Sequence, residues 1–232
     1  MNVLLLRLVG PMQSWGVQSR FTERDTGLEP SKSGVVGLLC AAQGRRRDEP
    51  IAELAGLRMG VRVDQEGVIA RDFHTAGKGG ILKADGRVDK DRLVVSTRYY
   101  LADARFLVGL EGEDLDLLAR LHAALRNPVW PLYLGRRAFV PGEPVWLKDG
   151  LRPGEDLMSA FRTYPWLGCD PEKRPQQVRL VIEDPDGPEV RPDQPLSFDP
   201  DDRRFAPRYV RTLFIPAPPL REEEEGICIS PD

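Results

Sequence analysis

The order of the periodic segments in the first 128 residues limits the possible folds more than any other feature of the sequence. Residues 3–9 form a nearly continuous apolar run, VLLLRLV, which is typical of a strand covered on at least one face. A helix is expected to run to residue 42, because Ser31 or Ser33 can cap its start and Gly44 can end it.

Two strands and a second helix follow. Alternation of apolar and polar residues predicts strands at 57–63 and 104–110. The segment 112–128 is amphipathic, with acidic residues at its start, Arg126 near its end and Pro128 after it, as expected of a helix. With a further strand-forming stretch after it, the order is βαββαβ. We therefore predict an α+β fold with a ferredoxin-like (RRM-like) domain.

The segment 71–103 lies between the second and third of these strands and is the most irregular part of the chain. It carries glycine clusters, many basic side chains and a turn signal at Asp85-Gly86. A compact domain does not need such a long connection. We predict a long β-hairpin that leaves the body like a thumb.

The chain changes character near residue 142. The part after it is rich in proline and acid, with strands expected at 179–184 and 209–216 and a solvated acidic tail. Residues 1–150 hold 22 Lys and Arg against 19 Asp and Glu, whereas residues 151–232 hold 11 against 17. We expect a domain over 1–142, a small β-rich appendage over 143–232, and any basic surface in the first of these.

Several classes of protein are excluded by what the sequence lacks. The first apolar run is too short to span a bilayer and no signal-peptide cleavage pattern follows it, so we expect a cytoplasmic protein without membrane contact. Two histidines and three scattered cysteines make no metal ligand set, and we interpret the cysteines as packing thiols. GLEPSKSG and GKGGIL both lack a glycine that nucleotide-binding loops require. No metal and no cofactor are predicted.

The stretch LVGPMQSWGVQSRF follows the first strand and contains Trp15 and Arg20. An indole and a guanidinium displayed on a loop can stack on a base and contact a phosphate of single-stranded RNA. The alternative is that the indole is buried beneath the C-terminal third.

His74 lies at the start of the irregular segment, near several cations and two tyrosines. A metal-independent ribonuclease needs a general base near the 2′-hydroxyl and cations around the phosphate, and His74 could be that base. It could equally form hydrogen bonds at the root of the hairpin, or contact RNA without cutting it.

The last basic cluster is NPVWPLYLGRRAFVPG. Gly135 permits close approach of the backbone, Arg136 and Arg137 offer guanidinium forks, and Tyr133 offers a stacking face. An ordinary turn with a solvated arginine pair is the alternative.

Five stretches, LRLVGPMQSWG, SGVVGLLCAAQG, RDFHTA, STRYYLADARF and PLYLGRRAFVP, occur in the order and spacing found in the Cas-five family of RAMP proteins. The chain resembles the members of this family that belong to subtype I-E CRISPR Cascade complexes, over roughly residues 3–142. Where the family usually has Thr-Arg before the Ser-Gly of the first helix, this chain has Ser31-Lys32, which keeps the charge but loses the planar fork.

The resemblance implies a subunit that holds the 5′ handle of the CRISPR RNA and caps the Cascade backbone in antiviral defence. It would contact the neighbouring backbone subunit and the large subunit, and target DNA only through the guide. The thumb would lie across the guide near the handle. A separate subunit cuts the precursor RNA in this subtype, whereas in subtype I-C the Cas-five relative cuts it. We therefore expect His74 to bind RNA and not to cleave it.

Two other functions stay open at this point: a metal-independent endoribonuclease that uses His74, and a purely structural subunit whose basic loops bind proteins. The residues expected to contact RNA are Gln13, Trp15, Arg20, Arg24, Lys32, Ser33, Arg71, His74, Lys78, Arg98, Tyr133, Gly135, Arg136 and Arg137.

Overall fold

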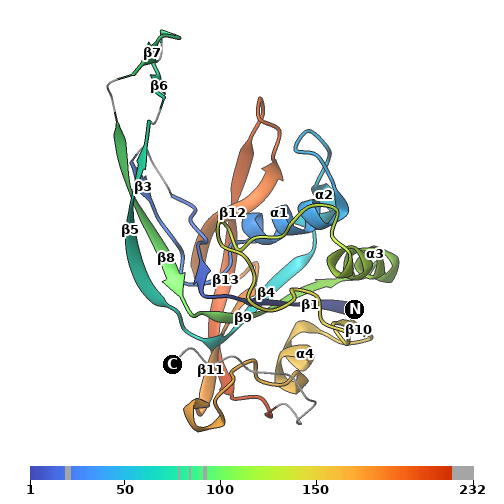
Figure 1. The fold of residues 1–232 in the computed structure, drawn as a ribbon. Coiled ribbons are helices and arrows are strands. Elements are labelled where there is room, and N and C mark those ends of the chain that lie inside the picture. Colours follow the sequence, from blue (N-terminus) through green and yellow to red (C-terminus); the bar gives the residue numbers. More distant parts are fainter. Residues whose placement is uncertain (19–21, 78, 84, 91–92, 221–232) are drawn as a thin grey trace.

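A seven-stranded antiparallel sheet organises the computed structural model, which describes residues 1–18, 22–77, 79–83, 85–90 and 93–220 (Figure 1). The strands are β1 (Asn2–Val9), β2 (Met12–Gln13), β3 (Glu23–Arg24), β4 (Arg58–Gln65), β5 (Val68–Ala76), β6 (Ile81–Leu82), β7 (Val88–Asp89), β8 (Val94–Ala102), β9 (Arg105–Gly112), β10 (Leu151–Pro153), β11 (Gln177–Glu183), β12 (Glu189–Ser197) and β13 (Arg204–Pro216). The helices are α1 (Lys32–Gln43), α2 (Ala52–Ala55), α3 (Leu115–Arg126) and α4 (Leu157–Thr163), with a 3-10 turn at Pro171–Lys173. The fold is of the α+β class, as expected.

The first part of the sheet has the predicted chain order. The main elements have the order βαββαβ: β1, α1, β4, β9, α3 and β10, with the short elements and the hairpin strands between them left out. The four strands lie side by side in the order β10-β1-β9-β4. Helix α1 begins at Ser31, whose Oγ accepts a hydrogen bond from the backbone N–H of Gly34, and it ends at Gly44 with a φ of 70°. Both ends of the helix are where the sequence predicts them.

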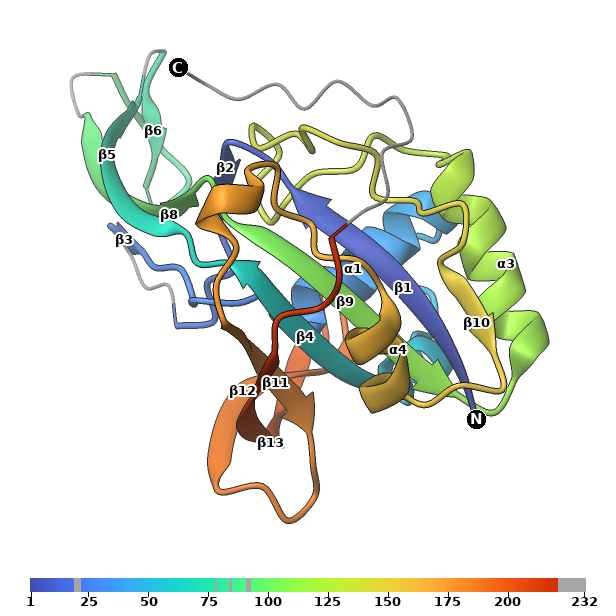
Figure 2. The same cartoon turned by 90° about the horizontal axis from the view of Figure 1, so that it is seen from below.

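The two faces of the sheet carry separate cores. Helices α1, α2 and α3 cover one face, and α4 covers part of the other (Figures 1 and 2). On the α4 side, the ring of Phe161 lies against Gly60 and Gly109, which oppose each other on β4 and β9. A Cβ on Gly60 would meet this ring at 2.7 Å. Burying such an aromatic side chain contributes roughly 1.5–3 kcal/mol to stability.

The C-terminal third does not form a sheet of its own, contrary to the expected appendage after residue 142. It is β-rich as predicted, but β11 pairs with β4 and continues the first sheet through β13 to β12. A buried ion pair holds the end of α4 against β4: Arg62 on β4 binds Asp64 and donates to the carbonyl oxygens of Phe161 and Tyr164. Burial raises the pKa of Asp64, and the adjacent Arg62 opposes that rise.

The irregular segment is a long hairpin that projects from the body (Figure 1). β5 and β8 pair in register from Val68↔Ala102 to Ala76↔Val94, and β6 pairs with β7 near the tip. The hairpin therefore begins at residue 68, slightly earlier than the predicted 71.

The cysteines differ from one another. Cys40 is a buried free thiol as expected, Cys169 is disulfide-bonded and not the free thiol that was predicted, and Cys228 lies outside the described residues. Among the described residues, no group of three or more His, Cys, Asp or Glu side chains could hold a metal ion. No helix within the described ranges is long and apolar enough to cross a membrane.

Candidate nucleic-acid interface

A second sheet at the root of the hairpin brings charged residues from three strands together. β8 pairs with β5 on one edge and with the short strand β3 on the other. In this register Arg98 on β8 lies between Arg24 on β3 and Asp72 on β5. Opposed residues of neighbouring strands point to the same face, so two guanidinium groups and one carboxylate share a row across the sheet.

The next row on the same face contains His74 and Ser96, which oppose each other. Ser96 Oγ donates a 3.2 Å hydrogen bond to the carbonyl oxygen of His74, and Arg98 Nε donates to Ser96 Oγ at 3.1 Å. The imidazole itself is exposed and bonds to no described residue. This arrangement orients the guanidinium of Arg98, but it does not orient the imidazole.

Arg71 lies on the other face of the hairpin. It opposes Tyr99, and its guanidinium carbon is 5.1 Å from the ring centroid of Phe73. Phe73 is 61% exposed. Arg71 therefore does not share the face of His74, because side chains alternate along a strand.

Arg136 connects this sheet to the body. Its Nη2 donates to the carbonyl oxygens of Tyr99 at 2.8 Å, Arg24 at 3.2 Å and Asp25 at 3.4 Å. Burial lowers the pKa of Arg136, and the nearby cation Arg98 lowers it further. A guanidinium with this partner set remains charged and holds the backbone of β3 and β8 together. Arg136 is therefore not the fully solvated fork that the sequence suggests, because its side chain is half-buried and its Nη2 is bonded to the protein's own backbone.

Gly135 explains why the guanidinium of Arg136 can reach so far inward. Its φ is 87°, and a Cβ built on it would lie 1.7 Å from the carbonyl oxygen of Ser14. The backbone here also bonds directly to the loop after β1, since Ser14 N–H donates to the carbonyl oxygen of Leu134. The close approach predicted for Gly135 is real, but its neighbour is the protein's own backbone.

Arg137 and Tyr133 have a different environment from Arg136. Arg137 is exposed and forms no ion pair with the residues that the structure describes, whereas Tyr133 is half-buried. Of the predicted pair of forks, Arg137 is the exposed one and Arg136 is half-buried.

The prediction that Trp15 is displayed is wrong. Its side chain is 2% exposed and packs on the first turn of α1, where a Cβ on Gly34 would meet the indole at 2.9 Å. The indole Nε1–H donates to Gln13 Oε1 at 3.1 Å. Gln13 is itself buried, and its amide donates to the carbonyl oxygens of Leu8 and Ala104. Both side chains are core groups, and the indole lies against α1 rather than the C-terminal third.

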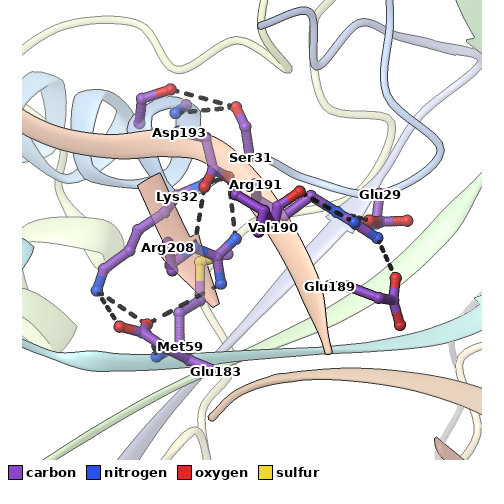
Figure 3. Close-up of polar contacts among 12 residues, drawn as sticks. Glu29, Ser31, Lys32, Met59, Glu183, Glu189, Val190, Arg191, Asp193 and Arg208 are labelled. Atoms are coloured by element: carbon purple, nitrogen blue, oxygen red, sulfur yellow. Dashed lines mark hydrogen bonds and ion pairs between the residues drawn. The ribbon is translucent and has the colours of Figure 1, made fainter. Parts of the chain in front are cut away.

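Lys32 is also not exposed to a ligand. Its side chain is buried, and Nζ binds both carboxylate oxygens of Glu183, at 3.0 and 2.9 Å (Figure 3). Burial lowers the pKa of Lys32, and Glu183 opposes that change. Ser33 is half-buried and its Oγ lies 3.4 Å from Ser31 Oγ. Two further predicted contacts, Arg20 and Lys78, lie outside the described residues.

The predicted residues that the structure brings together are thus Arg24, His74 and Arg98 on one face, with Arg137 on the adjoining loop. Sequence reasoning missed Asp72 and Phe73. The alternation of ARDFHTA, once taken as a strand, would have placed Asp72 beside His74 and Phe73 on the opposite face.

Comparisons with known proteins agree with one another. The family described as "CRISPR-associated protein (Cas_Cas5)" matches residues 3–211. The CRISPR system Cascade subunit CasD of Escherichia coli (strain K12) is 33% identical over 183 residues, which cover 73% of this chain and 80% of that protein. Two solved structures, each with a TM-score of 0.75, are also similar. One is titled as a crystal structure of a Cas protein, with 46% identity covering 94% of this chain and 98% of that one. The other is titled as a CRISPR RNA-guided surveillance complex, with 37% identity covering 93% and 91%.

Proposed function

The chain belongs to the Cas5 family of CRISPR-associated proteins, and on this premise we propose that it is the subunit of a CRISPR RNA-guided surveillance complex that binds the 5′ handle of the CRISPR RNA. The single observation that carries the RNA-binding role is the row formed by Arg24 and Arg98 at the root of the projecting hairpin. Arg24 is exposed and Arg98 is half-buried, and guanidinium groups placed along one strand face suit the phosphates of a single strand.

The position of this row also supports a path for RNA. Arg137 follows Arg136 in the chain, and Arg136 contacts the backbone of Arg24, so the loop that carries the exposed Arg137 adjoins this sheet. We assign the βαββαβ part to a ferredoxin-like domain and the β5–β8 hairpin to a thumb that lies across the guide. Phe73, exposed on the other face of the hairpin, offers a surface for base stacking.

The partners follow from the same assignment. The chain would cap the backbone of the complex, with the neighbouring backbone subunit and the large subunit beside it, and it would reach target DNA only through the guide. With this role, the chain would be located in the cytoplasm together with the rest of the complex.

We further propose that the subunit binds RNA without cleaving it. A general base needs a partner that orients it near the reacting hydroxyl. The imidazole of His74 has no such partner among the described residues, since the contact of Ser96 is to the backbone carbonyl.

The experiment that tests this function uses the purified full chain with repeat RNA in the presence of a chelator. We expect the RNA to be retained on the protein and recovered intact, both with the wild type and with His74→Ala. Discrete cleavage at the handle boundary that H74A abolishes would identify an endoribonuclease instead. Absence of RNA binding by the chain and by its assembled complex would leave a purely structural subunit.

A further inference from the structure

Residues 29–32, here called the entry segment of α1, are held by charged side chains of β11 and β12, and a side chain of β13 binds one of these in turn (Figure 3). Glu29 accepts a 2.9 Å hydrogen bond from Arg179 on β11 and a 3.1 Å hydrogen bond from Arg191 on β12. Lys32 is held twice: Nζ binds Glu183 on β11, and its backbone N–H donates to Asp193 on β12 at 2.8 Å.

The inner part of this network is fully enclosed. Arg208 on β13 binds Asp193 through two parallel hydrogen bonds of 2.9 Å, and both side chains are less than 5% exposed. Glu183 also accepts a hydrogen bond from the backbone N–H of Met59 on β4. Buried ion pairs add little net stability compared with apolar packing, so their use is better explained by the unique geometry that they impose.

The entry segment lies shortly after strand β3, which ends at Arg24. Only residues 25–28 separate Arg24 from Glu29, and residues 24–28 are here called the Arg24 loop. At the other end of this loop, Arg136 holds the carbonyl oxygens of Arg24 and Asp25. The loop is therefore fixed at both ends, by Arg136 on one side and by the C-terminal strands on the other.

We infer that Glu29 and Lys32 are positioning residues, through which the C-terminal strands hold the Arg24 loop in the place where it binds RNA. This inference rests on the proposed function. It gives β11, β12 and β13 a role in RNA binding although none of the residues in this network belongs to the strand face that carries Arg24 and Arg98.

The test compares Glu29→Gln with a matched control, Glu66→Gln. Glu66 binds the same Arg179, through hydrogen bonds of 2.7 and 2.9 Å, but it lies outside the entry segment. Each variant removes one negative charge and one carboxylate partner of Arg179. In E29Q, Arg179 keeps Glu66 and Arg191 keeps Glu189, so the fold should be retained.

The sign of the effect separates positioning from simple electrostatics. Removing a negative charge favours RNA binding by itself, so charge alone predicts equal or tighter binding by both variants. Positioning predicts that E29Q binds handle RNA about fivefold more weakly than E66Q. In an Arg24→Ala background the E29Q effect should disappear, because the group that Glu29 positions is absent.

The measurement is the affinity of the full chain for handle RNA over a range of salt concentrations. Thermal unfolding of each variant is the control for folding. If the wild type binds the handle but E29Q and E66Q bind it with equal affinity, the inference is wrong and the proposed function still stands. An undiminished E29Q effect in the R24A background would also overturn the inference, because the effect would then not act through Arg24. Failure of the wild type to bind would overturn the proposed function as well.

Discussion

The guanidinium of Arg136 donates a 2.8 Å hydrogen bond to the carbonyl oxygen of Tyr99, and this contact divides two adjacent arginines into different roles. Arg136 faces inward and fixes the hairpin root to the body, whereas Arg137 is exposed. The basic pair of the sequence is thus one structural residue and one candidate ligand for phosphate.

Single substitutions should separate these roles. Arg136→Ala removes the 2.8 Å donor of the Tyr99 carbonyl oxygen, which then keeps only the 3.4 Å contact with Ser14 Oγ, and should lower the free energy of unfolding by about 1–3 kcal/mol. Arg137→Ala should change stability by less than about 0.5 kcal/mol. It should weaken handle binding and reduce the slope of log K against log salt by about 0.7, because one phosphate contact is lost. Thermal unfolding and salt-dependent handle binding should be measured for both variants. If R137A lowers stability and R136A does not, the two roles are assigned the wrong way round.

Gly135→Ala should be strongly destabilising. The positive φ alone costs an alanine about 1–2 kcal/mol, and the collision with the carbonyl oxygen of Ser14 adds to this. Gly37→Ala is the matched control, because Gly37 lies within α1 and a Cβ there meets nothing within 4 Å. G37A should stabilise the protein by roughly 0.5–1 kcal/mol. Denaturant unfolding of the two variants would count against this account if G135A were as stable as the wild type.

Shortening the hairpin should leave the body folded. The replaced segment should be 77–93 and not a longer one, because Thr97 and Arg98 on β8 pair with β3. A two-residue turn that joins β5 to β8 should keep the unfolding midpoint of the wild type, since few core contacts cross into such a projection. Assembly of the complex or target binding should decline instead. Wild-type target binding by a complex with the shortened subunit would remove the reason for assigning a thumb.

Cys40 should be unreactive in the native protein. Burial raises the pKa of its thiol to about 11, so only about one molecule in a thousand carries the thiolate at pH 8. Treatment with iodoacetamide at pH 8 should leave Cys40 unmodified, and modification should follow unfolding in guanidinium. Peptide mapping by mass spectrometry measures both states, and rapid native alkylation would show that the thiol is accessible.

Helices α1 and α3 and the hairpin could be predicted because their signals are local, whereas α2 and α4 were not predicted. Ser31 and Gly44 bound α1 through contacts within one turn, and the β5–β8 pairing follows from alternation and a glycine-rich tip. The position of β11 beside β4 depends on residues more than 100 positions apart, and no local pattern specifies such a pairing.

The errors at the candidate site have the same origin. In the sequence, Lys32 has the pattern of an exposed cation, but in the structure it binds Glu183, which comes from a distant strand. In the sequence, Trp15 has the pattern of an exposed indole, but in the structure Gln13 and the first turn of α1 enclose it. Arg136 and Arg137 are identical in type, and only the tertiary contacts of Arg136 with the backbone of β3 and β8 distinguish them. Residues whose role depends on tertiary contacts could not be assigned from residue type and spacing.

Photo-crosslinking in the assembled complex, with 4-thiouridine placed at single positions of the CRISPR RNA, would locate the handle on the subunit. We predict that handle nucleotides crosslink to peptides containing β3, β8 and the loop around Arg137, and that Arg24→Ala reduces the yield. Handle crosslinks confined to other subunits, or to the α4 side of the sheet, would contradict it.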